Sequence, residues 1–85
     1  MYFVYVLQSL KKEIFYIGST SNVEKRLRKH NGGSTKSTKP YIPWVVICTE
    51  EYKGKQEACK REYFLKHPKG FWEKKKIISQ NKRSV

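Results

Sequence analysis

The chain has 85 residues, with 19 basic side chains against seven acidic ones and a formal net charge of +12. This charge indicates a polyanionic partner, with nucleic acid first and an anionic membrane second. All seven acids are glutamates, which excludes sites built on aspartate, such as Ser-His-Asp triads, aspartic protease dyads and Asp-clustered two-metal nucleases. Aromatic residues make up 14% of the chain, more than a disordered basic tail carries, so we expect a single folded domain over residues 1–85.

The cysteines and the apolar segments indicate the compartment. Cys48 and Cys59 lack the spacing of a zinc site, so we expect reduced thiols in the core. No apolar run reaches the roughly 18 residues that cross a bilayer. Residues 1–7 are apolar but lack the basic region and cleavage site of a signal peptide. We therefore expect a cytoplasmic protein with no membrane partner.

The first third of the chain predicts a hairpin followed by a helix. Residues 2–7 and 14–18 are aromatic and β-branched runs joined by a polar turn, a pattern typical of two antiparallel strands. Ser21 and Glu24 have the spacing of a capping box, which predicts that a helix begins there. A Gly-Gly pair ends this helix near residue 31.

The remainder predicts a loop, a third strand and two helices. Residues 31–43 are polar and interrupted by Pro and Gly, which is typical of a loop. Residues 44–49 form the most apolar run, which we expect to be a central or buried strand. Residues 55–66 and 71–79 have helix-forming composition, and we expect the tail to fray from about residue 80. The last helix offers four apolar side chains for burial: Phe71, Trp72, Ile77 and Ile78.

The resulting element order is β-β-α-β-α-α. Three strands and two or three helices predict an α+β fold, a small three-stranded sheet flanked by helices. The helix between the hairpin and the third strand permits a mixed or an antiparallel sheet, and we expect the antiparallel one.

Three polar side chains fall on helix faces that should be buried. Arg26 and His30 lie three and seven residues after Val23, so a guanidinium and an imidazole border the apolar stripe of the first helix. Glu62 lies within the stripe of the second helix, where a carboxylate suits one hard cation such as Mg²⁺. Each has a structural alternative: a snorkelling arginine, a histidine that complements the helix dipole, and a glutamate paired with Lys66.

Two tyrosines on the predicted strands are further candidates. Phe15 and Ile17 share one face of their strand, and Tyr16 points to the other face. Tyr5 lies on the preceding strand, and both tyrosines have packing as the structural alternative. Gly18 within a strand indicates a bulge or a close backbone approach.

Together these residues match an ordered set of family motifs. In chain order the matching residues are Phe3-Val4-Tyr5, Tyr16-Ile17-Gly18, Asn22, Arg26, His30, Glu57-Ala58, Glu62 and Leu65-Lys66. With these motifs, residues 2–66 resemble a GIY-YIG nuclease domain of the small stand-alone type, similar to the N-terminal module of the excinuclease C subunit. Two positions depart from the family pattern: Phe3 replaces the Gly that opens the first motif, and Ser19 stands where a Lys is often found.

The resemblance implies hydrolysis of phosphodiester bonds in DNA with one divalent ion, Mg²⁺ or Mn²⁺, and a place in DNA repair. In that reading Glu62 holds the metal ion and Arg26 braces the non-bridging phosphate oxygens. Tyr16 or Tyr5 orients or deprotonates the attacking water, and which of them is the base stays open. His30 hydrogen-bonds a phosphate or a tyrosine hydroxyl.

The basic surface should contact DNA mainly through its backbone. Lysines outnumber arginines by 15 to four, which suits diffuse phosphate contacts with weak sequence preference and strong salt dependence. The residues expected to contact nucleic acid are Gly18, Lys25, Lys29, Lys36, Lys39 and the run 74–76.

The alternative is a non-catalytic, basic nucleic-acid-binding module. There, strand tyrosines such as Tyr5 and Tyr16 stack on bases and Glu62 is structural. Convergence of both tyrosines with Arg26, His30 and Glu62 in one cleft favours the nuclease, whereas tyrosines flat on an open sheet favour the binding module. A third possibility keeps the active site but has cleavage only in the presence of a protein partner. In the nuclease interpretation, the chain either cuts with low specificity or borrows its specificity from a partner. The sequence does not predict the oligomeric state.

Overall fold

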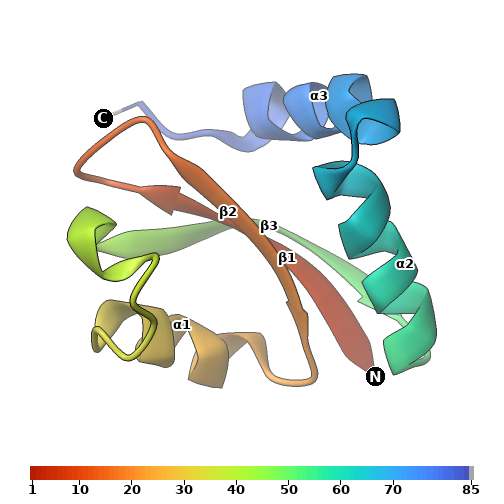
Figure 1. Ribbon diagram of the computed structural model, residues 1–85, viewed down its shortest axis with the longest axis horizontal. Helices are drawn as coiled ribbons and strands as arrows, with labels where there is room; N and C mark the ends of the chain where they lie inside the picture. The colour runs from red at the N-terminus through yellow and green to blue at the C-terminus, as the bar shows by residue number, and fades with distance from the viewer. Residues whose placement is uncertain (85) are drawn as a thin grey trace.

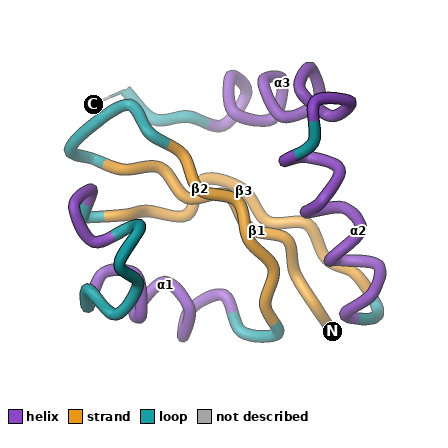
Figure 2. Tube along the Cα trace, viewed as in Figure 1, coloured by secondary structure: helices purple, strands orange, loops and turns teal. Residues whose placement is uncertain are grey.

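The centre of the molecule is a three-stranded antiparallel sheet with helices on both faces, as the computed structural model of residues 1–84 shows (Figures 1 and 2). In chain order the main elements are β1 (Tyr2–Ser9), β2 (Phe15–Thr20), α1 (Val23–Asn31), β3 (Trp44–Tyr52), α2 (Lys55–Lys66) and α3 (Phe71–Asn81). The predicted α+β fold, the antiparallel pairing and the element order β-β-α-β-α-α are confirmed.

The central strand is β1, because the strand order is β2-β1-β3. The prediction that residues 44–49 form the central strand is therefore wrong. Trp44 is buried, but the four residues that follow it are only half-buried. β1 is buried from Val4 to Ser9 and pairs with a strand on each side, whereas β2 and β3 are edge strands.

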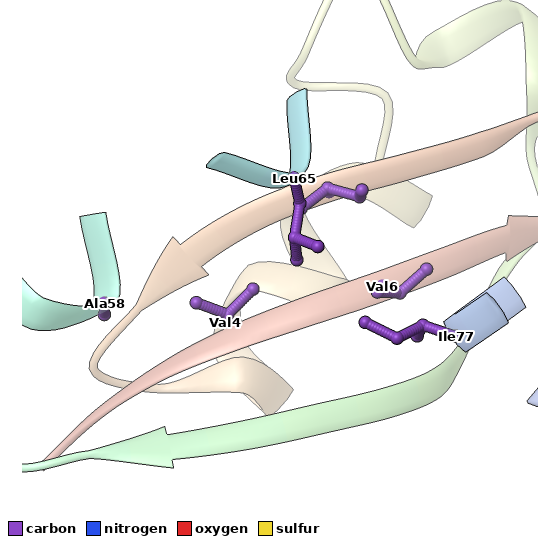
Figure 3. Close-up of a cluster of buried hydrophobic side chains, with 6 residues drawn as sticks. Val4, Val6, Ala58, Leu65 and Ile77 are labelled. Atoms are coloured by element: carbon purple, nitrogen blue, oxygen red, sulfur yellow. The ribbon is translucent and has the colours of Figure 1, made fainter. Parts of the chain in front are cut away.

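Alternation along β1 sends its apolar side chains to the two faces of the sheet. Tyr5 and Leu7 pack with Trp44 on the face that α1 covers. Val4 and Val6 point to the opposite face, where full burial of such side chains stabilises the fold by about 1.5–3 kcal/mol each. Figure 3 shows this second cluster, which α2 and α3 complete with Ala58, Leu65 and Ile77.

Helix α1 begins one residue later than the capping box predicts. The N-cap is Asn22, whose side-chain oxygen accepts a hydrogen bond of 3.0 Å from the backbone N–H of Lys25. Thr20 supports this start, since its hydroxyl accepts a hydrogen bond of 3.2 Å from the N–H of Asn22. Asn caps a helix as well as Ser does, so Ser21 is left exposed at the turn.

Helix α3 buries only half of its predicted apolar set. Ile77 is buried and Ile78 packs against the same cluster, as expected. Phe71 and Trp72 remain 43% and 77% exposed, so their predicted burial is wrong. They occupy the first turn of α3, directly after the Pro68–Gly70 turn, and only the later turns of the helix reach the core.

The segment after α3 returns to the β1–β2 hairpin (Figure 1). Gln8 donates a hydrogen bond of 3.0 Å to the carbonyl of Arg83 and accepts one of 2.8 Å from its N–H. We expect fraying from about residue 80; in the structure α3 extends to Asn81, and Gln8 holds the backbone beyond it.

Both cysteines are free thiols. Cys48 is half-buried, but Cys59 is exposed on α2, so the expectation of a core position is wrong for Cys59. Within residues 1–84, no helix is both long enough and apolar enough to cross a bilayer.

Candidate active site

The predicted catalytic residues gather around β2, an edge strand of the sheet. Tyr16 lies on β2 and Tyr5 on β1, both on the face that α1 covers with Arg26 and His30. Glu62 comes from α2 on the opposite face. Because β2 has no neighbour on its outer side, side chains from the two faces meet around its edge. The predicted strand parity of Tyr16 and the predicted inward face of His30 are confirmed.

A buried chain of hydrogen bonds starts at Tyr5. The Tyr5 oxygen lies 3.3 Å from Nε2 of His30, and Nδ1 of His30 lies 2.9 Å from the Thr38 hydroxyl oxygen. The Thr38 hydroxyl donates its one proton to the carbonyl of Thr35 at 3.3 Å. We therefore assign the His30 proton to Nδ1, which donates to Thr38, and Nε2 accepts from the Tyr5 O–H.

Thr38 reaches this position because the loop between α1 and β3 is pinned to the start of β3. Asn31 accepts a hydrogen bond of 2.7 Å from the backbone N–H of Trp44 and donates one of 3.0 Å to its carbonyl. The Trp44 indole donates a hydrogen bond of 2.9 Å to the Thr38 carbonyl. These contacts hold Thr38, which is 2% exposed, behind the imidazole.

Burial sets the protonation states of this chain. The pKa of Tyr5 is raised to about 12, first by burial and then by its neighbour Tyr16. The charge of Arg26 and its hydrogen bond to the phenol act in the opposite direction. Burial, and secondarily Arg26, lowers the pKa of His30. At neutral pH Tyr5 therefore carries its proton, and His30 is neutral and able to accept one.

Glu62 is held as a carboxylate by two donors. The Ser19 hydroxyl donates a hydrogen bond of 2.6 Å to Oε1, and the Lys66 ammonium lies 2.9 Å from Oε2. Burial opposes ionisation, but the bonds from Ser19 and Lys66 and the charge of Arg26 outweigh it, and the pKa of Glu62 is lowered. The Lys66 ammonium also lies 5.3 Å from the ring centroid of Tyr16, so Lys66 contacts both Glu62 and Tyr16.

The site offers one carboxylate to a metal ion. Among residues 1–84, no three His, Cys or Glu side chains form a ligand group. Mg²⁺ is often bound by one or two carboxylates and keeps several waters, and an ionised Glu62 fits that requirement. Ser19 and Lys66 both contact this carboxylate, so the pairing of Glu62 with Lys66 given above as the structural alternative is also present.

Gly18 makes room for Tyr5. A methyl group on its Cα would lie 2.5 Å from the Tyr5 oxygen and 2.7 Å from Cζ, closer than real side chains approach. The close approach predicted at this glycine is thus present, but the neighbour is a tyrosine ring. Gly18 is buried against Tyr5, and its contact with DNA stays a prediction.

Four lysines expected to bind nucleic acid lie outside this cluster. Lys25 and Lys29 are exposed on α1, and Lys36 and Lys39 are exposed on the loop that follows it. Their contact with DNA stays a prediction.

Three residues of the site were not predicted as part of it: Ser19, Thr38 and Lys66. Lys66 was named in the sequence analysis as the ion-pair partner of Glu62 one helical turn away, but only as the structural alternative. Ser19 is marked in the sequence only as a departure from the family pattern, and nothing singles out Thr38 within its loop. The arrangement argues against the binding module, since Tyr5 is fully buried and Glu62 is joined to Tyr16 through Lys66.

Comparison with known proteins identifies relatives of the chain. The GIY-YIG catalytic domain model matches residues 1–76. "Structure-specific endonuclease subunit SLX1" of Debaryomyces hansenii is 43% identical over 75 residues, which cover 79% of this chain and 22% of that protein. The UPF0213 protein CPE1444 of Clostridium perfringens is 40% identical over 67 residues, which cover 78% of this chain and 71% of that protein. The solution NMR structure of the UPF0213 protein BH0048 from Bacillus halodurans aligns with a TM-score of 0.53 at 29% identity, covering 93% of this chain and 83% of that one.

Proposed function

The chain belongs to the GIY-YIG family of nuclease domains, hydrolases of phosphodiester bonds, and from this premise we propose that it is a divalent-metal-dependent DNA endonuclease with a one-metal site. The observation that carries the proposal is the meeting of four side-chain types around one strand edge. A guanidinium, an imidazole, two phenols and an ionised carboxylate come from four different elements: Arg26, His30, Tyr5, Tyr16 and Glu62.

Arg26 holds the scissile phosphate. Its guanidinium forks onto two non-bridging oxygens and offsets the negative charge that grows in the transition state. Arg26 is half-buried, and its positive charge acts on the pKa values of Tyr5, His30 and Glu62, which supports this role. The buried Tyr5 hydroxyl lies 3.3 Å from Nε2 of His30, which gives this phenol a positioning role.

Tyr16 contacts the attacking water. It lines an open groove with Lys66, whereas Tyr5 is fully buried behind it. Ser19 stands where the family often has a lysine, so that position carries no positive charge in this chain. The Lys66 ammonium, which lies over the Tyr16 ring, supplies this charge instead. His30 holds the Tyr5 hydroxyl from behind, and Thr38 fixes the imidazole tautomer.

Glu62 holds the divalent ion. When bound, Mg²⁺ or Mn²⁺ at this carboxylate supplies Lewis acidity to the phosphate and stabilises the leaving oxygen. Ser19 and Lys66 keep Glu62 ionised and oriented, since each donates to a different carboxylate oxygen. Glu62 would be the one protein ligand, and water and phosphate oxygens would supply the others.

Exposed lysines indicate how the chain contacts DNA, and a relative indicates that it has a protein partner. Lys25, Lys29, Lys36 and Lys39 contact backbone phosphates, so binding weakens steeply as salt rises. The fungal relative is described as an endonuclease subunit, and by analogy a protein partner supplies specificity to this chain.

Nicking of supercoiled plasmid with Mg²⁺ or Mn²⁺ tests the proposal. Glu62→Gln, Arg26→Ala and Tyr16→Phe should each lower the nicking rate by about 10²-fold or more, as removal of one charge-stabilising group does elsewhere. The control is Glu51→Gln, which changes an exposed glutamate outside the matching motifs and should nick at the wild-type rate. Equal rates for the Glu62 and Glu51 variants, both folded by circular dichroism, would refute the assignment of Glu62.

A further inference from the structure

Two large aromatic side chains lie side by side on the surface at the start of α3. Phe71 and Trp72 are 43% and 77% exposed, and their ring centroids are 5.3 Å apart. Nothing in the hydrophobic core needs them there, because the later residues Ile77 and Ile78 complete it. Adjacent exposed aromatic rings of this size indicate a surface that contacts another molecule.

A groove connects these rings to the candidate active site. One hollow of about 390 Å³ is lined by Tyr16, Lys66 and Lys74, among others. A second hollow of about 410 Å³ shares Lys66 and Lys74 and is also lined by Phe71 and Trp72. Since two lysines line both hollows, they form one continuous surface from Tyr16 to Trp72, which we name the aromatic groove.

The aromatic groove alternates aromatic rings with ammonium groups. Lys74 and Lys75 place their ammonium nitrogens 6.0 and 5.3 Å from the ring centroid of Phe71, and Lys66 does the same over Tyr16. Within the described residues no acidic side chain lines either hollow. Glu73 lies between Trp72 and Lys74 in the sequence, but its carboxylate pairs with Arg61 at 3.4 Å.

We propose that the aromatic groove binds an unpaired DNA strand beside the phosphodiester bond that is cleaved, with a base stacked on Trp72. The lysines meet the phosphates, and the exposed rings meet base faces that only an unpaired strand offers. A paired duplex hides its base faces in the stack and would use the lysines alone. The proposal rests on the proposed function and gives it a substrate class: DNA with unpaired nucleotides next to the cut.

Binding without cleavage tests the aromatic groove. We would measure fluorescence anisotropy of a labelled forked DNA and of a fully paired DNA of the same sequence, in EDTA so that no divalent ion is present. Trp72→Ala should weaken binding of the forked DNA about tenfold or more, since loss of one stacking contact has effects of that size. Binding of the paired DNA should change less than twofold. The matched control is Tyr63→Ala, an aromatic side chain on α2 that is 68% exposed but does not line the groove.

The outcomes separate this proposal from the nuclease assignment. If Trp72→Ala binds forked DNA as well as the wild type does, or weakens both DNAs equally, the proposal is overturned, while wild-type plasmid nicking still supports the nuclease. A selective loss in Trp72→Ala supports the groove even if the plasmid assay fails. An equal loss in Tyr63→Ala would also overturn it, because any exposed ring would then suffice.

Discussion

Substitution of Gly18 by alanine should damage the site without removing any of its functional groups. The added methyl would lie 2.5 Å from the Tyr5 oxygen, whereas ordinary contact begins at 3.4 Å, so the approach is about 0.9 Å too close. The Tyr5 ring or the β2 backbone must move by that amount. The hydrogen bond from Tyr5 to His30 is already 3.3 Å long, so it would be lost or badly bent.

Both stability and catalysis should fall. Adding a methyl group to a well-packed interior costs about 1–3 kcal/mol, and in a domain of this size each kcal/mol lowers the melting temperature by about 4–8 °C. A displacement of about 1 Å in a positioned group costs about 10²-fold in rate. Because one contact is with the hydroxyl oxygen itself, Gly18→Ala should destabilise a Tyr5→Phe background less than it destabilises the wild type.

Thermal unfolding and plasmid nicking of the same preparations measure the two effects. Gly54→Ala is the matched control, since a methyl there would meet only Oε1 of Glu57 at 3.7 Å, an ordinary contact. Gly54 is the N-cap of α2, where Gly is preferred to Ala, so this variant should lose only about 0.5–1 kcal/mol of stability and keep the wild-type nicking rate. A Gly18→Ala variant as stable and as active as Gly54→Ala would refute the packing of Tyr5 over Gly18 and its role in the site.

Three further predictions follow from the polar contacts. Arg61→Met should lower the free energy of unfolding by about 1–3 kcal/mol in urea titrations, because the substitution removes two hydrogen bonds to Glu50 of 2.9 and 3.1 Å. The control Arg28→Met removes a largely exposed ion pair with Glu24 at 3.6 Å and should change the free energy of unfolding by less than about 1 kcal/mol. Thr38→Val should shift the pH dependence of nicking while Thr38→Ser restores it, because only a hydroxyl fixes the His30 tautomer; identical pH profiles would contradict this. Since the folded pKa of His30 is lowered, the unfolded chain binds more protons below about pH 6.5, so stability should fall as the pH drops from there, and a His30→Gln variant should show a flatter slope.

The side-chain periods of helices and strands allowed much of the site to be predicted. A period of 3.6 residues places Arg26 and His30 on one face of α1 wherever the helix packs. A period of two residues sends Tyr16 away from Ile17 in any pairing of β2. The order of motifs along the chain then identified Glu62 on another helix. None of these steps needs the order of the strands in the sheet.

The contacts that complete the site depend on that order, which the sequence does not encode locally. Apolar content favoured residues 44–49 as the centre, yet β1 takes that place and β2 becomes an edge. Only with β2 at an edge can Lys66 from one face lie over Tyr16 on the other. The same reliance on apolar content predicted burial of Trp72, whereas hydrophobicity alone does not distinguish a core side chain from a contact surface.

The position of Glu62 depends on both sides of α2. Its neighbour Arg61 binds Glu50 of β3 and Glu73 of α3, while Glu62 itself accepts the hydrogen bond from Ser19 of β2. Helix α2 is therefore bonded to both edge strands, β2 and β3. The distance between these two strands sets where the Glu62 carboxylate lies relative to Tyr16. It follows that Arg61→Met should reduce nicking by more than its loss of folded protein explains, although Arg61 does not line the site. A nicking rate per folded molecule equal to that of Arg28→Met would show that Ser19 and Lys66 position the carboxylate without this support.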